Sequence, residues 1–303
     1  FNIFIKSIAI FVSITTIILL IALLVSYFED KNSKFTIISG DEKSSNIIAV
    51  LELNGLIIER NKGFSSLADA FTISPSLTKN SLKNLKELSP KIIIVSINSP
   101  GGTVSASKRL YEIVKNFREN NKNIEILFHT NELLASGAYW VATAADEIYA
   151  SYGSVIGSIG VKGPDWIYYD NPKTISSGIF GNKVETENGI KIFSNIAGNS
   201  KDIFNSFRKP TKKEIQHLQN MVDDIYDDFV RIISKERKIE IQTIVNEIGA
   251  LIYTTKQASN LNLINDEINI DDLINNKVRE KKFRDYKAIR ITNANNSLIR
   301  EFF

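Results

Sequence analysis

The longest run of uncharged, mostly apolar residues lies near the start of the chain, over residues 7–28. At about 1.5 Å of rise per residue, a helix formed by this run can cross a hydrocarbon core about 30 Å thick. The run is apolar on every face, unlike a core helix, and it is longer than the apolar segment of a cleaved signal peptide. We therefore expect an uncleaved membrane anchor over residues 1–30, followed by a polar linker over residues 31–45.

Beyond the linker, apolar segments of two kinds alternate along the chain. Runs rich in apolar residues, as in strands buried on both faces, occur at 46–58, 91–97 and 124–129. Segments with helical spacing lie between them, at 76–88 and 103–120. This alternation of strands and helices predicts an α/β fold.

A long amphipathic helix is predicted over residues 210–237. Thr211 and Glu214 form a capping-box pattern at its start. The apolar positions of this helix indicate a face that packs on the core or on another subunit; they are Ile215, Leu218, Val222, Ile225, Phe229 and Ile232. Shorter elements are expected after it, with a helix at 240–248 and a strand at 251–253.

Composition places the chain among ordinary globular proteins, with 43% hydrophobic and 23% charged residues over 303 positions. The formal net charge of +3 is too small to indicate nucleic-acid binding. The absence of cysteine excludes disulfides, cysteine nucleophiles and thiolate metal sites. With only His129 and His217 available, a histidine-rich metal site is not expected. We therefore expect neither a metal nor another cofactor, and no nucleic-acid partner.

Two short stretches of small residues stand where strands are predicted to end. In the first, residues 98–102 (NSPGG), glycine N–H groups are free to point at a ligand oxygen, although the same sequence also suits a plain tight turn. In the second, residues 135–138 (ASGA), Ser136 precedes a run that could be helical. Such a serine lies beside helix N–H groups that can stabilise an oxyanion, or it simply caps the helix.

Three segments follow one another in a specific order and spacing: INSPGG at 97–102, LASGAYWVATAADEIYA at 134–150 and GSVIGSIGV at 153–161. Together they resemble the core of the signal peptide peptidase A family in its short, single-repeat form. That family consists of membrane-associated serine peptidases with a ClpP/crotonase-like fold of repeated β-β-α units. The resemblance implies a peptidase domain over residues 46–266 and leaves residues 267–303 as a C-terminal helix and tail.

The resemblance also assigns roles to residues within these segments. Ser136 takes the place of the nucleophile. The N–H of Gly137, with an N–H of the Gly101-Gly102 turn, takes the place of the oxyanion hole. A serine hydroxyl attacks a carbonyl only when a base removes its proton, so the assignment also needs a general base.

The base that the resemblance implies is Lys201, which stands in a G-x-x-K context at residues 198–201. Ser158 takes the place of the serine that holds the lysine amine. A lysine acts as a base only where desolvation lowers its pKa from about 10.4 toward neutrality, and Ser-Lys pairs are a known variant of the triad. Other lysines after Ser136 are alternative candidates, namely Lys162, Lys183 and Lys191.

The expected function is therefore that of a membrane-anchored serine endopeptidase with a Ser-Lys dyad. It would cleave apolar peptides, such as signal peptides left in the membrane, on the periplasmic or extracytoplasmic side of a bacterial inner membrane. Because one chain carries a single copy of the motif set, the resemblance implies a homo-oligomeric ring. The alternatives are a crotonase-like acyl-CoA enzyme, a catalytically silent membrane scaffold, or a Ser-His-Asp hydrolase that uses His129 or His217.

Overall fold

The computed structural model describes residues 13, 15–18, 20, 35–59, 71–169, 174–178, 181–185, 197 and 199–292, with the backbone alone at 174–178 and 181–185. The expected anchor over residues 1–30 lies almost entirely outside these residues. Among the residues that are described, no helix combines the length and the apolar character needed to cross a bilayer.

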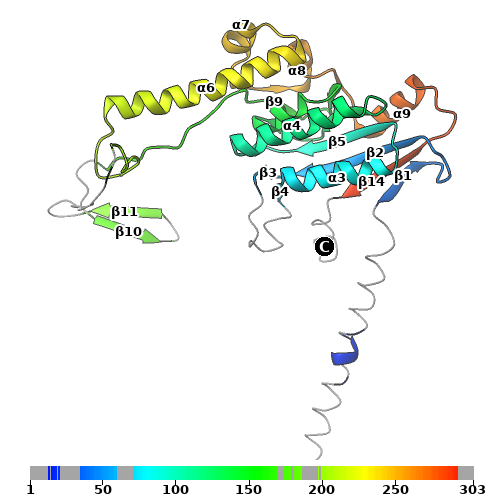
Figure 1. Ribbon diagram of the computed structural model, residues 1–303, viewed down its shortest axis with the longest axis horizontal. Helices are drawn as coiled ribbons and strands as arrows, with labels where there is room; N and C mark the ends of the chain where they lie inside the picture. The colour runs from blue at the N-terminus through cyan, green and yellow to red at the C-terminus, as the bar shows by residue number, and fades with distance from the viewer. Residues whose placement is uncertain are drawn as a thin grey trace, which may run out of the picture.

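A seven-stranded sheet forms the centre of the described part of the chain (Figure 1). Every neighbouring pair of strands is parallel except the pair at one edge, formed by residues 36–40 and 287–292, which is antiparallel. In spatial order the strands are β1 (Thr36–Gly40), β14 (Lys287–Thr292), β2 (Ile47–Asn54), β5 (Ile92–Asn98), β6 (Glu125–Thr130), β8 (Glu147–Ala150) and β13 (Asp266–Glu267). The α/β class predicted from the sequence is thereby confirmed.

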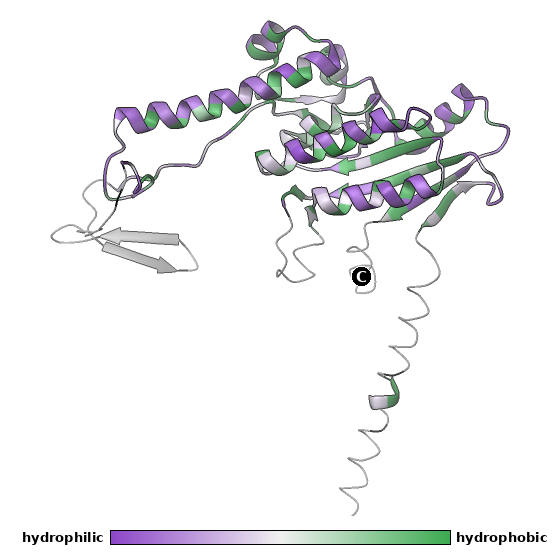
Figure 2. Ribbon diagram, viewed as in Figure 1, coloured by the Kyte–Doolittle hydropathy of each residue, from purple (hydrophilic) through white to green (hydrophobic). Residues whose placement is uncertain are grey.

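The central strand β5 is buried on both faces, as its continuous apolar sequence requires. Ile93 and Val95 belong to the larger hydrophobic cluster, whereas Ile92 and Ile94 belong to a second cluster on the opposite face. Helices cover both faces: α3 (Pro75–Glu87), α4 (Val104–Asn120), α5 (Gly137–Ala142) and α6 (Lys212–Arg237) contribute to the larger cluster, and α9 (Ile270–Glu280) to the second. Figure 2 shows apolar strands between helices whose outer faces are polar.

A second, three-stranded sheet carries the two serine turns. β7 (Leu133–Ala135) pairs in parallel with β9 (Val155–Gly157), and β9 pairs antiparallel with β12 (Ile252–Thr254). Ser136 follows β7 directly and precedes the first residue of α5. Because β7 and β9 are parallel neighbours, the segments that leave their carboxyl ends start side by side.

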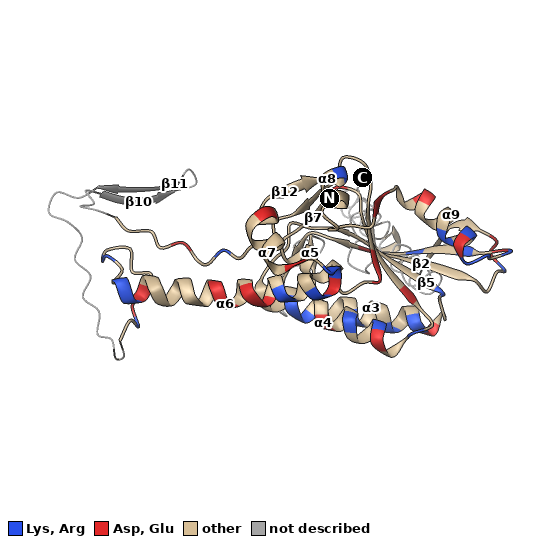
Figure 3. Cartoon of the chain, turned by 90° about the horizontal axis from the view of Figure 1, so that it is seen from above, with Lys and Arg blue, Asp and Glu red and all other residues tan. Residues whose placement is uncertain are grey.

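Helix α6 extends from the body as a long arm (Figures 1 and 3). Its carboxyl-terminal part packs on the core, where Phe229 and Ile233 are buried. Nearer its start, Ile215 and Met221 are 53% and 48% exposed. The predicted apolar stripe is therefore covered only toward the end of the helix within one copy of the chain.

The shorter elements lie around the two ends of this arm. The expected helix at 240–248 is a short α-helix followed by a π-helical turn, and a helix also forms within 255–263. The elements are α7 (Ile241–Thr243), η1 (Ile244–Ile248) and α8 (Thr255–Asn260), with a hairpin of β10 (Thr174–Gly178) and β11 (Gly181–Glu185) near the far end of the arm (Figure 1).

The main sheet extends beyond the range 46–266 expected for the peptidase domain. Residues 36–40, within the expected linker, form β1, and residues 287–292, within the expected tail, form β14 between β1 and β2. Ala288 and Ile289 of β14 are fully buried. The sequence pattern hides this strand because lysine and arginine interrupt a short apolar run, whose partner β2 is distant in the sequence.

Candidate active site

Ser136 occupies a strained turn between β7 and α5. Its backbone has φ 54° and ψ −125°, a region that residues with a side chain rarely adopt. The turn is held from both sides, because Ser136 N–H donates to Gly157 O at 2.9 Å and Trp140 N–H donates to Ser136 O at 3.0 Å. All six residues of α5 are buried, so the helix cannot relax the strain, while the side chain of Ser136 stays partly exposed.

The glycine turn after β5 packs directly against this serine. The last residue before the turn, Ser99, pairs with β7: its N–H donates to Leu133 O at 2.8 Å, and its carbonyl accepts from Ala135 N at 3.2 Å. Gly101 has φ 98°, and a Cβ there would lie 2.7 Å from Gly137 N and 2.9 Å from the Cβ of Ser136. Only a residue without a side chain fits this contact.

Gly102 is fixed by a second neighbour. It forms an isolated bridge with Ile57 of the short strand β3 (Leu56–Ile57), which pairs with β4 (Thr72–Ile73). A Cβ on Gly102 would lie 1.9 Å from Ile57 O, so a side chain is excluded by backbone and not by a movable group.

Two backbone N–H groups beside Ser136 are left without a partner. Within the described residues, neither Gly102 N–H nor Gly137 N–H donates a hydrogen bond to protein. The two groups are close, since a Cβ built on Gly137 would lie 3.4 Å from Gly102 N. Paired free donors next to a serine hydroxyl can stabilise the oxyanion of a tetrahedral intermediate.

Ser158 lies beside Ser136 at the end of the neighbouring strand. The register pairs Ala135 with Gly157, so the two serines are the next residues on adjacent parallel strands. Ser158 also has a positive φ, 52°, and its N–H donates to Leu251 O at 2.7 Å. The structure therefore brings together five of the six residues expected in the site.

Lys201, the sixth, lies apart from them. It is exposed, in the segment that precedes α6, at the far end of the arm (Figure 1). The near end of the arm meets the site, where the ring of Phe229 stacks on Trp140 with centroids 4.5 Å apart. From Glu214 to Phe229 the helix advances 15 residues, or about 22 Å at 1.5 Å per residue. One copy of the chain therefore does not place Lys201 beside its own Ser136.

Of the three alternative lysines, the structure describes the side chain of Lys162 alone. Lys162 forms an exposed ion pair with Asp165 at 3.0 Å, and Lys191 and the side chain of Lys183 lie outside the described residues, as does Gly198 of the G-x-x-K pattern. His129 is fully buried, with its Nε2 2.9 Å from Ile268 O, and this burial lowers its pKa. Its position in the core accounts for it as a structural histidine.

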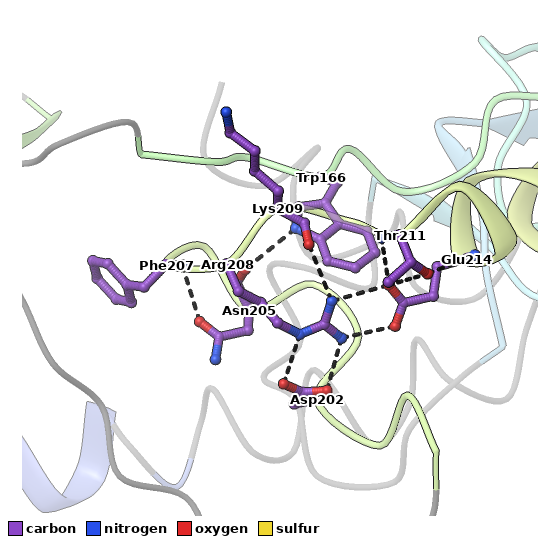
Figure 4. Close-up of polar contacts among 8 residues, drawn as sticks. All are labelled: Trp166, Asp202, Asn205, Phe207, Arg208, Lys209, Thr211 and Glu214. Carbon is purple, nitrogen blue, oxygen red and sulfur yellow. Dashed lines mark hydrogen bonds and ion pairs between the residues drawn. The ribbon is translucent and has the colours of Figure 1, made fainter.

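The segment around Lys201 is ordered by charged groups that sequence reasoning did not connect (Figure 4). Arg208 contacts Asp202 through Nε and Nη2, both at 2.7 Å, and Glu214 through Nη1 at 2.9 Å and Nη2 at 2.7 Å. These contacts with Arg208 hold the pKa of both carboxyl groups below their usual values. The predicted capping box is present, because Glu214 accepts from Thr211 N at 2.8 Å.

Among the described positions, no group of three or more histidine, aspartate and glutamate residues is arranged to hold an ion. Four aspartates of α6 lie along the arm (Figure 3); they are Asp223, Asp224, Asp227 and Asp228.

Comparison with known proteins matches a peptidase family to the part of the chain that contains Ser136, Ser158 and Lys201. The model of "Peptidase family S49" matches residues 118–284, more than half of the chain. A putative protease of Methanocaldococcus jannaschii is 33% identical over 187 residues, which are 62% of this chain and 55% of that protein. A putative signal peptide peptidase SppA of Enterococcus faecium is 26% identical over 252 residues, 82% of this chain and 68% of that protein. Protease 4 of Haemophilus influenzae is 27% identical over 84% of this chain and 39% of its own length.

Solved structures with a similar chain path include two proteases. A membrane-bound stomatin-specific protease aligns with a TM-score of 0.46 at 14% identity, over 77% of this chain and 84% of that one. ClpP1 from Listeria monocytogenes aligns with a TM-score of 0.45 at 14% identity, over 74% of this chain and 94% of that one.

Proposed function

Because the chain belongs to peptidase family S49, we propose that it is a membrane-anchored serine endopeptidase with Ser136 as nucleophile and Lys201 as general base. The observation that carries this proposal is the strained Ser136 beside the unpartnered N–H groups of Gly102 and Gly137. A strained serine next to paired free donors is an arrangement suited to acyl transfer.

The proposed reaction has two halves. The neutral amine of Lys201 takes the hydroxyl proton as Ser136 Oγ bonds to the substrate carbonyl carbon, and the N–H groups of Gly102 and Gly137 receive the developing negative charge. The intermediate then expels the amine half of the peptide, which takes its proton from Lys201. Water hydrolyses the resulting ester on Ser136 by the same route. Ser158 holds the lysine amine without adding a charge.

The distance within one chain supports a site shared between two copies. Lys201 of one subunit would meet Ser136 of the next, because the arm carries it about 20 Å away from its own nucleophile by the length of α6. The uncovered apolar positions at the start of α6, Ile215 and Met221, supply surface for such an association. A repeated head-to-tail contact of this kind closes into a ring, and we propose a homo-oligomeric ring with a ClpP/crotonase-like subunit fold.

The proposed substrates are apolar peptides, including remnant signal peptides. An anchor over residues 1–30 would hold the site close to the bilayer, where such peptides lie, on the extracytoplasmic side of a bacterial inner membrane. The name of the Enterococcus faecium relative is in keeping with this substrate class.

The test combines two inactive variants. We expect the full-length chain in detergent to hydrolyse an apolar fluorogenic peptide and to be labelled by a fluorophosphonate at Ser136. Ser136→Ala and Lys201→Ala should each be inactive while folded. Co-assembled in equal amounts, they should recover about a quarter of wild-type activity, because a quarter of the shared sites join an intact serine to an intact lysine.

Each other outcome is informative. Full activity of Lys201→Ala would remove this lysine from the mechanism and direct the search to Lys162, Lys183 and Lys191. An inactive mixture of the two variants that still co-assembles would contradict the shared site. Lys162→Ala is the matched control, because it removes an exposed lysine that is paired with Asp165, and it should retain activity.

A further inference from the structure

The far end of the arm poses a physical problem for a general base. Residues 199–211 contain no regular helix or strand, and two of them, Ser200 and Phe204, have positive φ values of 60° and 69°. A base must be held to within a fraction of an ångström of its target, because a misplacement of about 1 Å can cost 100-fold in rate. Something other than secondary structure must therefore fix the backbone that carries Lys201.

Arg208 provides the main restraint (Figure 4). Its three guanidinium nitrogens bridge Asp202, the residue directly after Lys201, to Glu214 in the first turn of α6, with contacts of 2.7–2.9 Å. Glu214 is only 5% exposed and is itself tied to Thr211 by the capping box. The guanidinium therefore joins the lysine segment to the one rigid element within its reach.

An indole from another part of the chain, that of Trp166, braces the same segment. The Arg208 guanidinium lies 5.4 Å from the ring centre of Trp166, which in turn is 5.4 Å from the ring of Phe204. Trp166 Nε1–H donates to Asn205 O at 3.3 Å, so the indole is anchored on the segment at three points. Flat cation faces stacked on indole are characteristic of arginine and are poorly reproduced by lysine.

Lys201 itself takes no part in this network. It is exposed, and within the described residues its amine has no hydrogen bond or ion pair. The adjacent carboxylate of Asp202 is turned onto Arg208 and fully engaged there. The network thus fixes the backbone beside Lys201 and occupies the carboxylate of the next residue, which would otherwise be free to pair with the amine.

From these contacts we infer that Arg208 is a positioning residue for Lys201: it locks the lysine-bearing segment onto the start of α6 and keeps Asp202 away from the amine. This inference rests on the proposed function, in which Lys201 is the base. Arg208 does not touch the substrate or Ser136. It acts on catalysis only through the place and the ionisation of Lys201.

The experiment uses the full-length chain with Arg208→Ala and Arg208→Lys, and with Arg231→Ala as the matched control. Arg231 lies on α6 and is paired with Asp228 at 2.9 Å, but its side chain is 62% exposed and lies 17 residues along the helix from Glu214. We expect Arg208→Ala to lower kcat about 100-fold with KM changed less than about twofold, since only the positioned base is lost. The control should stay within about twofold of wild type on both constants.

Two further readouts separate positioning from general damage. The pH at which the rate is half-maximal should rise by about one unit in Arg208→Ala, because Asp202 is freed to stabilise the charged lysine. Millimolar guanidinium chloride should restore part of the activity of Arg208→Ala and leave the control unchanged. Arg208→Lys keeps the charge but loses the planar fork that contacts Asp202 and Glu214 through two hydrogen bonds each, so it should fall between the alanine variant and wild type.

A structural readout keeps the inference independent of the proposed function. Trypsin should cleave after Lys201 about 10-fold faster in Arg208→Ala, because the segment opens more often when its main restraint is lost. Unchanged cleavage, together with an unchanged pH profile, would overturn the inference even if Lys201→Ala is inactive. Faster cleavage in Arg208→Ala with full activity of Lys201→Ala would instead retain the restraint and refute the lysine as base.

Discussion

The serine turn and the far end of the arm, the two places that hold the proposed catalytic groups, are built by different physical means. Ser136 is held by backbone hydrogen bonds and by helix α5, whose residues are all buried. The segment that carries Lys201 is held by one guanidinium, two carboxylates and a half-buried indole at the start of a 26-residue helix. In this chain a packed core sustains the strain at the serine, whereas the segment that carries the proposed base lies off the core and depends on polar contacts.

The largest effect on stability is expected at the contact between the arm and the body, where Phe229 packs on Trp140. Phe229 of the arm is 1% exposed and stacks at 10° on Trp140, one turn after Ser136. Phe229→Ala should lower the free energy of unfolding by about 3–5 kcal/mol, through lost burial and the cavity that remains. Urea unfolding at neutral pH measures this.

Activity of Phe229→Ala should fall even where the protein is folded, because the arm would no longer leave the body at a fixed angle. Lys235→Ala is the control on the same helix, since Lys235 is exposed and lies away from the start of α6, which the proposed association uses. It should change the free energy of unfolding by no more than about 0.5 kcal/mol within one copy. Equal losses in both variants would show that the stacked pair has no special part in fixing the arm.

The glycine turn tests the serine region alone. Gly102→Ala would place a Cβ 1.9 Å from Ile57 O, so the turn must move and take its N–H away from Ser136. We expect kcat to fall about 100- to 1,000-fold, the cost of one oxyanion donor. Steady-state kinetics measure the loss, and Gly163→Ala, which would meet only a methyl group of Val222 at 3.1 Å, is the control.

At a second glycine, Gly137, the loss of activity should be reversed by a second substitution. A Cβ on Gly137 would lie 2.1 Å from the buried Oγ of Ser107 and 2.8 Å from its Cβ. Gly137→Ala should therefore be impaired as well, but Ser107→Gly removes the obstructing side chain and should recover most of the loss. No partner change can rescue Gly102→Ala, because its obstacle is backbone. Equal behaviour of the two variants would contradict the geometry of the turn.

The sequence predicts the serine region better than the arm for the same physical reason. Ser136, the glycine turn and Ser158 lie in the short motifs that carry the family resemblance, so the resemblance names them together, although the apolar pattern alone does not predict β7 or β9. The restraint by Arg208 depends on how one side chain reaches two others, and nothing in the spacing of charges indicates it. The capping box at Thr211 is the exception, because its two residues are neighbours on a helix and the pattern is local.

Strand β14 and the position of Lys201 show the limit of such reasoning. β14 pairs with β2 across more than 230 residues of sequence, as in Lys287 with Ile47, and its charged ends mask a short buried run. The family resemblance names Lys201, but the length of α6 decides that it cannot reach Ser136 of the same chain. Such a distance follows from the three-dimensional fold and not from motifs.

As pH falls, the sheet around His129 should lose stability before the segment around Lys201 does. The pKa of Asp202 and of Glu214 is lowered by Arg208, so their contacts stabilise the fold fully above the ordinary carboxyl pKa of about 4 and are lost only as pH falls through the lowered values. Burial lowers the pKa of His129 in the sheet. Its contribution is complete above the unfolded pKa of about 6.5 and is lost as pH falls toward the lowered value, because the unfolded chain then binds the proton first.

The smallest effect we predict is on the free energy of unfolding between about pH 7.5 and pH 5.5. This range spans the ordinary pKa of histidine but not that of carboxylates. The free energy of unfolding should fall by about 1 kcal/mol, at up to about 1.4 kcal/mol per unit below the ordinary pKa of histidine. Replacing the histidine in His129→Asn should flatten this slope, whatever it does to absolute stability. Hydrogen-exchange protection of residues 200–214, corrected for the intrinsic pH dependence, should stay constant over the same range in wild type. Protection that falls there in wild type would mean that Arg208 does not hold its carboxylates as the contacts require.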